Sequence, residues 1–281
     1  MPKNTHILVK YSMITNLIQD GKTKTIQELD VYQQSLLFAE LSLIAYNDEK
    51  QARAQAQEIG FTEVHFFDHN GAQGYTFETE HDLVVACRGT EPTEINDLAA
   101  DLRALPVRSQ TMGRVHKGFK LEADKIWAGI RAQIEASEKM TWFTGHSLGA
   151  AMTTLCAARC FYHAPHIVIG AIFTYGSPRA GWRGFVNNLH VPHWRWVNNA
   201  DVVTRVPLAA MGYIHHGTIR YINTFGNVRE FTYWQRIKDK FRGICKGLKT
   251  LSFKNFSDHS MTNYVAHIAR KVSGEEYPQS K

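Results

Sequence analysis

The segment 145–149, Gly-His-Ser-Leu-Gly, has the residue types and spacing of a catalytic nucleophile. It follows a short apolar run at 142–144 and precedes a stretch rich in Ala, Met and Leu that predicts a helix over 147–161. A serine on such a strand-to-helix turn projects its hydroxyl above the sheet, and the glycines on either side let the two backbones approach closely. The start of the helix adds N–H groups and a partial positive charge that favour an anionic intermediate. We therefore predict that Ser147 is a nucleophile.

A serine hydroxyl is a weak nucleophile at neutral pH, so it requires a base and an acid that orients the base. On a strand-to-helix turn of this kind the chain order is serine, then acid, then histidine. Asp201 is the predicted acid because it follows an expected strand at 194–197, and strand-end loops build the sites of doubly wound sheets. The other acids after the serine lie in a basic segment, at the C-terminus or beside a candidate base: Glu230, Asp239, Glu275, Glu276 and Asp258.

His259 is the predicted base because it lies on the loop that opens the last expected helix, from which a side chain can reach across the sheet edge. His215 and His216 follow Asp201 closely and lead into a strand, while His267 falls on the polar face of the last helix. In this hypothesis His259 takes the serine proton and then protonates the leaving alcohol. Asp201 fixes the tautomer of the imidazole and stabilises the imidazolium.

The rest of the chain has the composition of a globular α/β protein. Its 281 residues are 44% hydrophobic and 21% charged, and its apolar runs are far shorter than the ~20 residues of a membrane-spanning helix. Hydrophobic periodicity predicts five helices, over 32–46, 119–137, 147–161, 234–251 and 260–272. It predicts strands over 63–67, 74–79, 82–88, 142–144, 167–175, 194–197 and 218–223.

This alternation of strands and helices indicates a mainly parallel central sheet with helices on both faces. The turn signal Asn70-Gly71 joins the first two strands. No long polar linker divides the chain, so we predict one domain over residues 1–281.

The sequence predicts neither a metal site nor a cofactor. The four cysteines, at 87, 156, 160 and 245, form no Cys-x-x-Cys pair and are expected to be reduced thiols. His190 and His193 form the nearest spaced histidine pair, and no carboxylate accompanies them.

Several further motifs occur in a characteristic order with the serine motif. They are Arg-Gly-Thr at 88–90, Asn-Asp-Leu-Ala-Ala-Asp-Leu at 96–102, Val-His-Lys-Gly-Phe at 115–119, Tyr-Gly-Ser-Pro-Arg-Ala-Gly at 175–181, Val-Asn-Asn-Ala-Asp at 197–201 and Asp-His-Ser-Met at 258–261. With these motifs the chain resembles, over about residues 36–268, the class 3 lipases. These are the fungal-type triacylglycerol lipases and their relatives, which have the α/β-hydrolase fold.

The resemblance implies the same three residues, Ser147, Asp201 and His259. It also implies an oxyanion hole made of Thr90, through its hydroxyl and N–H, and the backbone N–H of Leu148. A lid is implied over 91–97, where only Pro92 and Ile95 are apolar among three acids, which weakens the expectation of interfacial activation.

The sequence therefore predicts a lipase or carboxylesterase that hydrolyses acylglycerols or other carboxylic esters. A phospholipase A1-type enzyme and a membrane-surface lipid-binding protein are the alternatives. Nucleic-acid binding is not expected, since no motif for it occurs. The N-terminal residues lack the apolar core of a signal peptide, which predicts a cytoplasmic location, with secretion as the alternative. The sequence indicates no oligomeric state.

A basic segment, 229–254, suggests contact with lipid surfaces. Its eight basic and two acidic residues account for the whole net charge of +6. Apolar residues recur at helical spacing over 234–251, so this segment either binds an anionic lipid surface or packs its apolar face on the core.

Overall fold

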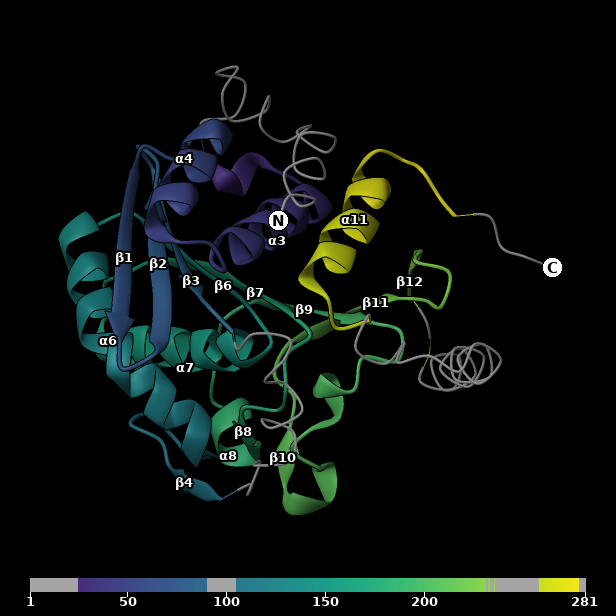
Figure 1. Cartoon of the computed structure of the whole chain (residues 1–281). Helices are drawn as coiled ribbons and strands as arrows, with labels where there is room; N and C mark the ends of the chain where they lie inside the picture. Colours follow the sequence, from purple (N-terminus) through teal and green to yellow (C-terminus); the bar gives the residue numbers. More distant parts are fainter. Residues whose placement is uncertain (1–24, 90–104, 231, 233–234, 236–257, 278–281) are drawn as a thin grey trace.

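The protein is built on a twisted sheet of eight strands (Figure 1). The computed structural model describes residues 25–89, 105–230, 232, 235 and 258–277. The strands are hydrogen-bonded in the order β1-β2-β3-β6-β7-β9-β11-β12. Their bounds are Glu63–His69 (β1), Ala72–Glu78 (β2), Asp82–Cys87 (β3), Met140–His146 (β6), Ile169–Tyr175 (β7), His193–Asn198 (β9), Thr218–Ile222 (β11) and Val228–Arg229 (β12).

Five adjacent central strands run parallel to one another: β3, β6, β7, β9 and β11. Antiparallel strands extend both edges, β1 and β2 on one side and β12 on the other. The mainly parallel sheet is thus confirmed, and the carboxyl ends of the five strands lie at one end of the sheet. Asn70 and Gly71 have φ of 49° and 83°, as a tight turn between β1 and β2 requires.

Helices cover both faces of the sheet (Figure 1). α3 (Val31–Ile44), α4 (Glu49–Ile59) and α11 (Met261–Val272) lie on one face, and α6 (Lys117–Ser137) and α7 (Leu148–His163) lie on the other. Strand β3 shows why both faces are apolar. Val84 and Ala86 join the core under α3, whereas the alternate residues Leu83, Val85 and Cys87 join the core under α6 and α7.

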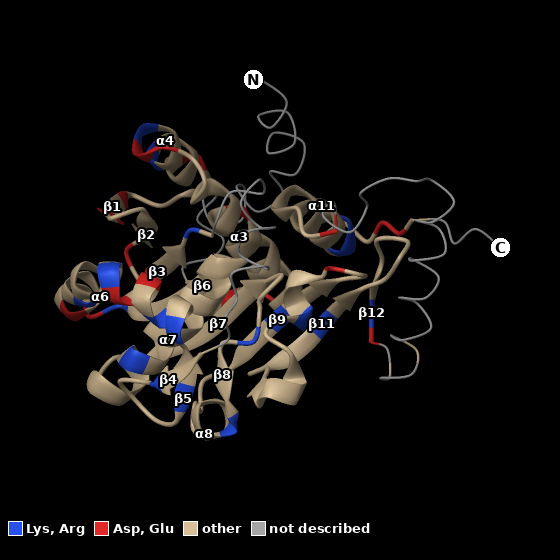
Figure 2. Ribbon diagram, turned by 60° about the horizontal axis from the view of Figure 1, so that its bottom comes forward, with Lys and Arg blue, Asp and Glu red and all other residues tan. Residues whose placement is uncertain are grey.

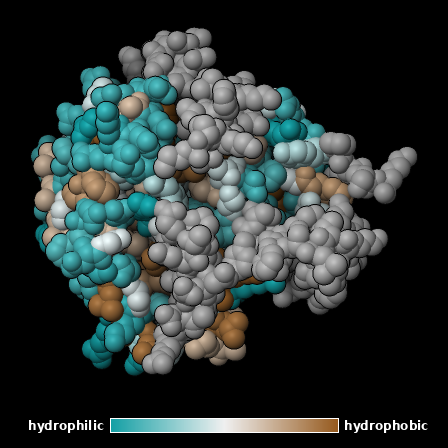
Figure 3. Space-filling model, in the orientation of Figure 1, coloured by the Kyte–Doolittle hydropathy of each residue, from teal (hydrophilic) through white to brown (hydrophobic). Residues whose placement is uncertain are grey.

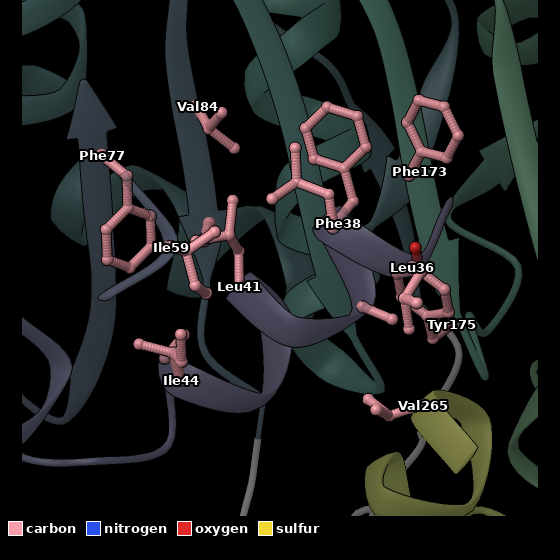
Figure 4. Packing of buried hydrophobic residues seen from close by; sticks show 14 of the residues in the cluster. Leu36, Phe38, Leu41, Ile44, Ile59, Phe77, Val84, Phe173, Tyr175 and Val265 are labelled. Atoms are coloured by element: carbon pink, nitrogen blue, oxygen red, sulfur yellow. The ribbon is translucent and has the colours of Figure 1, made fainter. Parts of the chain in front are cut away.

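Helix α3 is the centre of one core. Asp30 caps it by accepting from the N–H groups of Tyr32 and Gln33, and Oε1 of Gln33 accepts from the N–H of Asp30. Its buried residues surround most of the helix because it lies between the sheet and α11. The Phe38 ring stacks on Phe173 of β7 at 4.4 Å between centroids (Figure 4).

A second, smaller sheet stands beside the carboxyl end of the main one. It has the order β10-β8-β5-β4, with β4 Pro106–Arg108, β5 Arg114–His116, β8 Gly181–Trp182 and β10 Tyr213–Ile214. Around it are α8 (Arg183–Val186) and the 3-10 turns Val203–Arg205 and Ala209–Met211, while a further 3-10 turn, Ile26–Glu28, precedes α3. Apolar atoms reach the surface at this end of the molecule (Figure 3), where Leu208 and Met211 are exposed.

Most expected elements occur within two or three residues of their predicted bounds. The small sheet and α4 were not expected, and the predicted helix over 234–251 lies almost wholly outside the described residues. Cys87, Cys156 and Cys160 are free thiols, as predicted, while Cys245 lies outside the described ranges.

Two expectations stay predictions: the single domain over 1–281 and the cytoplasmic location. Among the helices that the structure describes, none has the length and apolar character needed to span a bilayer.

Replacing Phe38 with Ala should destabilise the protein by about 3–5 kcal/mol, because the change empties a fully buried ring site between α3 and the sheet. Leu121→Ala is the matched control, since Leu121 on α6 is 49% exposed, and it should change stability by less than about 0.5 kcal/mol. Equilibrium unfolding in urea measures both variants. Equal effects would contradict the assignment of Phe38 to the core.

Candidate active site

Ser147 sits in a strained turn between β6 and α7. Its φ of 57° and ψ of −129° are unusual for a residue with a side chain. Its N–H donates to the carbonyl of Tyr175 at 3.0 Å, which ties the turn to the end of the neighbouring strand β7. The residue is fully buried. The strand-to-helix turn predicted from the sequence is therefore present.

The two glycines of the motif allow the backbones around Ser147 to meet. A Cβ on Gly145 would lie 2.6 Å from the carbonyl oxygen of Gly149, and one on Gly149 would lie 2.2 Å from the carbonyl oxygen of Cys87. A Cβ on Gly89, after β3, would lie 3.2 Å from the Cβ of Ser147. The backbones around Ser147 and after β3 therefore pack too closely to leave room for a side chain at any of these three glycines.

Asp201 and His259 form a buried pair. The Nδ1 atom of His259 lies 3.0 Å from Oδ1 and 2.9 Å from Oδ2 of Asp201, and the two side chains are 1% and 0% exposed. Asp201 follows β9 and His259 precedes α11, and the two residues are 58 positions apart in the sequence. The structure brings together the acid and the histidine that the sequence singles out.

Tyr264 holds the carboxyl group of Asp201 from the opposite side. Its hydroxyl donates to Oδ2 of Asp201 at 2.7 Å and accepts from the N–H of Asn198 at 3.0 Å. Burial, and secondly the charge of Asp201, raise the pKa of Tyr264 well above 10. The N–H of Val203 donates to Oδ1 at 3.0 Å. Nothing in the local sequence predicts this contact, because Tyr264 and Asp201 are 63 positions apart.

Asp258 fastens the loop that carries His259. Its carboxylate accepts from Nδ2 of Asn199 at 3.1 Å and from the N–H of Ala200 at 3.3 Å. Its carbonyl accepts from Nδ2 of Asn198 at 2.9 Å. These bonds connect the histidine loop directly to the turn that leads to Asp201, so one turn fixes both members of the pair.

His146 packs beside His259 and supports its backbone. Its Nε2 lies 2.7 Å from the carbonyl oxygen of His259, which can only accept, so Nε2 carries the proton. In the neutral ring Nδ1 then accepts from the hydroxyl of Tyr46 at 2.8 Å. The two imidazole centroids are 4.5 Å apart. Burial, and secondly the nearness of His259, lower the pKa of His146 well below 6.5.

Two polar atoms of the site are buried and unpaired within the part of the chain that the structure describes: Oγ of Ser147 and Nε2 of His259. One is a hydroxyl and the other an imidazole nitrogen, which together can share a proton. Gly176 packs closely against the Asp201–His259 contact, since a Cβ there would lie 2.7 Å from the ring of His259 and 2.8 Å from Oδ2 of Asp201.

The three histidines not chosen as the base have other contacts. Nε2 of His215 pairs with the carbonyl of Thr204 at 2.9 Å, and Nε2 of His216 with that of Leu189 at 2.8 Å. His267 packs its ring against Tyr277, with 5.6 Å between centroids.

Of the two expected oxyanion donors, Leu148 is the first residue of α7 and therefore follows the strained serine directly. The first N–H groups of a helix have no acceptor within it. Thr90 and the expected lid over 91–97 lie outside the described residues, whose last member before the gap is Gly89.

Comparison with known proteins connects this geometry to a family. Residues 84–211 match the lipase (class 3) family. A lipase of Rhizomucor miehei is 30% identical, over 50% of this chain and 41% of that protein. Toxin TseL of Vibrio cholerae serotype O1 is 25% identical, over 59% of this chain and 33% of the toxin. The chain thus spans less than half the length of these two relatives.

The fold matches solved lipase structures. The structure of lipase II from Rhizopus niveus has a TM-score of 0.58 and 21% identity, over 68% of this chain and 80% of that one. At this identity the likeness shows the fold alone, and it confirms the predicted α/β-hydrolase fold. The family match confirms the resemblance to class 3 lipases that the motifs indicate.

The buried neutral His146 should make the protein less stable in acid. Its folded pKa is far below 6.5, so as the pH falls through 6.5 the unfolded chain takes up a proton that the folded chain does not, and stability is lost. In His146→Gln, whose amide can still donate to the carbonyl of His259, this loss should be smaller. Urea unfolding at a series of pH values above and below 6.5 measures the two slopes. If stability fell with pH equally in the variant and in the parent protein, His146 would not be a buried neutral group that lowers stability in acid.

Proposed function

We propose that this relative of the class 3 lipases is a serine carboxylic-ester hydrolase that acts on acylglycerols or other carboxylic esters. One observation carries the proposal: a buried Asp201–His259 pair lies beside a strained serine turn, and the serine Oγ and the histidine Nε2 have no partner within the described residues. The substrate in this proposal is an ester whose carbonyl group lies beside Oγ of Ser147 and Nε2 of His259.

In the first half of the reaction, Oγ of Ser147 attacks the carbonyl carbon of the ester and its proton passes to Nε2 of His259. The tetrahedral intermediate collapses, and the bond from carbon to the leaving oxygen breaks. His259 returns the proton to that oxygen, so the alcohol leaves neutral and the acyl group stays on the serine.

In the second half, water replaces the alcohol. His259 removes a proton from the water, the hydroxide attacks the acyl carbon, and the proton returns to Oγ of Ser147 as the acid leaves. Asp201 accepts from Nδ1–H of His259 throughout, which leaves Nε2 unprotonated before His259 removes a proton from serine or water, and stabilises the imidazolium that results.

The negative charge on the former carbonyl oxygen requires hydrogen-bond donors. We assign this role to the N–H of Leu148 and to the hydroxyl and N–H of Thr90. The partial positive charge at the start of α7 adds to it. Such donors contribute about 3–4 kcal/mol each in the transition state.

One alternative to this function differs only in substrate, and the other involves no catalysis. A phospholipase A1-type enzyme would use the same three residues on another headgroup. A protein that only binds membrane surfaces would need none of them, and the strained, glycine-lined turn at Ser147 favours an enzyme. The reaction as written uses neither a metal nor a cofactor.

Ser147→Ala should lower kcat on a soluble aryl ester by ~10⁴–10⁶, because the acyl-enzyme can no longer form. A phosphonate ester should label Ser147 and no other serine, which peptide mass spectrometry detects. Ser273→Ala is the matched control, since Ser273 is exposed at the far end of α11 and should leave turnover unchanged.

Retention of turnover in Ser147→Ala would exclude the proposed nucleophile. Loss of wild-type turnover on treatment with EDTA would contradict a metal-free mechanism.

The basic segment 229–254 suggests how the enzyme reaches its substrate. It carries the whole net charge of the molecule and leads directly to the loop of His259. Each Lys or Arg close to an anionic membrane contributes about 1 kcal/mol, and the effect fades beyond a Debye length. We propose that this segment holds the enzyme on anionic lipid surfaces.

Replacing Lys238, Lys246 and Lys249 with Gln should weaken sedimentation with anionic liposomes at low salt and leave soluble-ester turnover nearly unchanged. The control triple variant, Lys50, Lys125 and Lys271 to Gln, makes the same change in charge elsewhere and should retain binding. Equal binding of the parent protein to zwitterionic and anionic liposomes would contradict the proposal. The proposal would also be contradicted if the Lys238, Lys246 and Lys249 variant lost soluble-ester turnover in proportion to its loss of liposome binding.

A further inference from the structure

A cluster of three potential metal ligands lies at the opposite end of the sheet from Ser147. Glu63 and His65 of β1 and Glu78 of β2 bring one ligand atom each within 4.8 Å of one another. Glu63 opens β1 and Glu78 closes β2, beside the amino ends of β3 and β6. The serine follows the carboxyl end of β6. Figure 2 shows acidic positions (red) on this part of the sheet.

The two glutamates are placed unfavourably for an ordinary sheet surface. Glu63 and Glu78 are directly opposite each other in the antiparallel pair, where like charges repel. The side chain of Glu78 is only 3% exposed, so water screens its charge poorly. Lys139 and Gln133 donate to the two oxygens of Glu78 at 2.8 and 2.6 Å. Glu63, at 65% exposed, gives a dissolved ion access to the cluster.

The imidazole of His65 is aimed between the two carboxylates. Its Nε2 lies 3.9 Å from Oε2 of Glu63 and 3.9 Å from Oε1 of Glu78. These separations are too long for hydrogen bonds, and this nitrogen is buried without a hydrogen-bond partner in the part of the chain that the structure describes. Ligand atoms that share one tetrahedral ion, with bonds of about 2.0–2.2 Å, lie ~3.3–3.6 Å apart. The two separations from Nε2 of His65 therefore need to shorten by about 0.3–0.6 Å. The widest separation in the cluster, which is up to 4.8 Å, needs to shorten by about 1.2–1.5 Å.

We propose that Glu63, His65 and Glu78 bind a divalent transition-metal ion, with Zn²⁺ as the representative. An imidazole nitrogen with two carboxylate oxygens suits Zn²⁺, whereas Mg²⁺ and Ca²⁺ select sites of oxygen ligands alone. The ion neutralises the opposed glutamates and gives the buried nitrogen a partner. Lys139 competes for Glu78, which limits the affinity.

The site has a structural effect separate from ester hydrolysis. β1 is an edge strand, paired on one side by β2. An ion that joins both strands at their open end, close to Gln133 near the end of α6, stabilises this edge of the sheet. Any ligand that binds the folded chain and not the unfolded one raises the melting temperature.

Isothermal titration of the EDTA-stripped protein, residues 1–281, with Zn²⁺ tests the proposal, with Tm recorded in the presence and absence of the ion. We expect one saturable site per chain and a rise in Tm, with no such effect of Mg²⁺. His65→Ala should weaken binding at this site at least about tenfold. His81→Ala is the matched control: His81 is as exposed as His65, at 42% against 43%, and lies 3.8 Å from Glu80, but it is no part of the cluster. The His81→Ala variant should bind Zn²⁺ with the same affinity as the parent protein.

Lys139→Met gives a test that does not depend on loss of binding. Without the competing ammonium group, Oε2 of Glu78 is free to bind the ion, so affinity should rise severalfold. The proposal is overturned if the parent protein shows no saturable Zn²⁺ binding. It is also overturned if His65→Ala and His81→Ala bind equally, because the ion would then reside at other histidines.

Discussion

The buried contact between Asp201 and His259 is the constraint on which the rest of the site depends. A carboxyl group with no exposed surface must receive hydrogen bonds from the protein itself, since an uncompensated buried charge is strongly unfavourable. Asp201 receives them from Tyr264, from the backbone of Val203 and from His259. These donors come from α11, from the turn after β9 and from the loop before α11. The positions of all three elements are therefore set by one side chain.

A second constraint acts on the backbone around Ser147. The serine turn packs against β3 and β7 so closely that Gly89, Gly145 and Gly149 admit no side chain. Its neighbour His146 donates to the backbone of His259, so the nucleophile turn and the histidine loop are also joined directly. The distance between the candidate nucleophile and the candidate base is thus controlled by backbone packing and by one hydrogen bond. The side chains of Ser147 and His259 are therefore not needed to fix the positions of their own loops.

How much the sequence predicts depends on how local the signal is. Five consecutive residues are enough to predict Ser147 as the nucleophile, and apolar patterns predict the strands of the main sheet. Asp201 is found by its place after a strand. The roles of Tyr264 and Asp258 were missed because their partners lie about 60 residues away, and no local pattern reports such a contact. The strands of the small sheet have only two or three residues each, too few to show a period. Helix α4 was missed because its buried face includes the small residues Ala52 and Ala56.

The packing of α11 against α3 has a consequence for the order of events during synthesis. α3 is near the start of the chain, and α11, with the loop of His259, comes near its end. A nascent chain that has emerged only as far as β11 already contains Ser147 and Asp201, but it lacks the histidine. It also lacks Tyr264, which closes the hydrogen bonds of Asp201. The three residues of the proposed catalytic site are therefore brought together only when α11 docks onto α3, so a growing polypeptide cannot carry out the proposed reaction before that step.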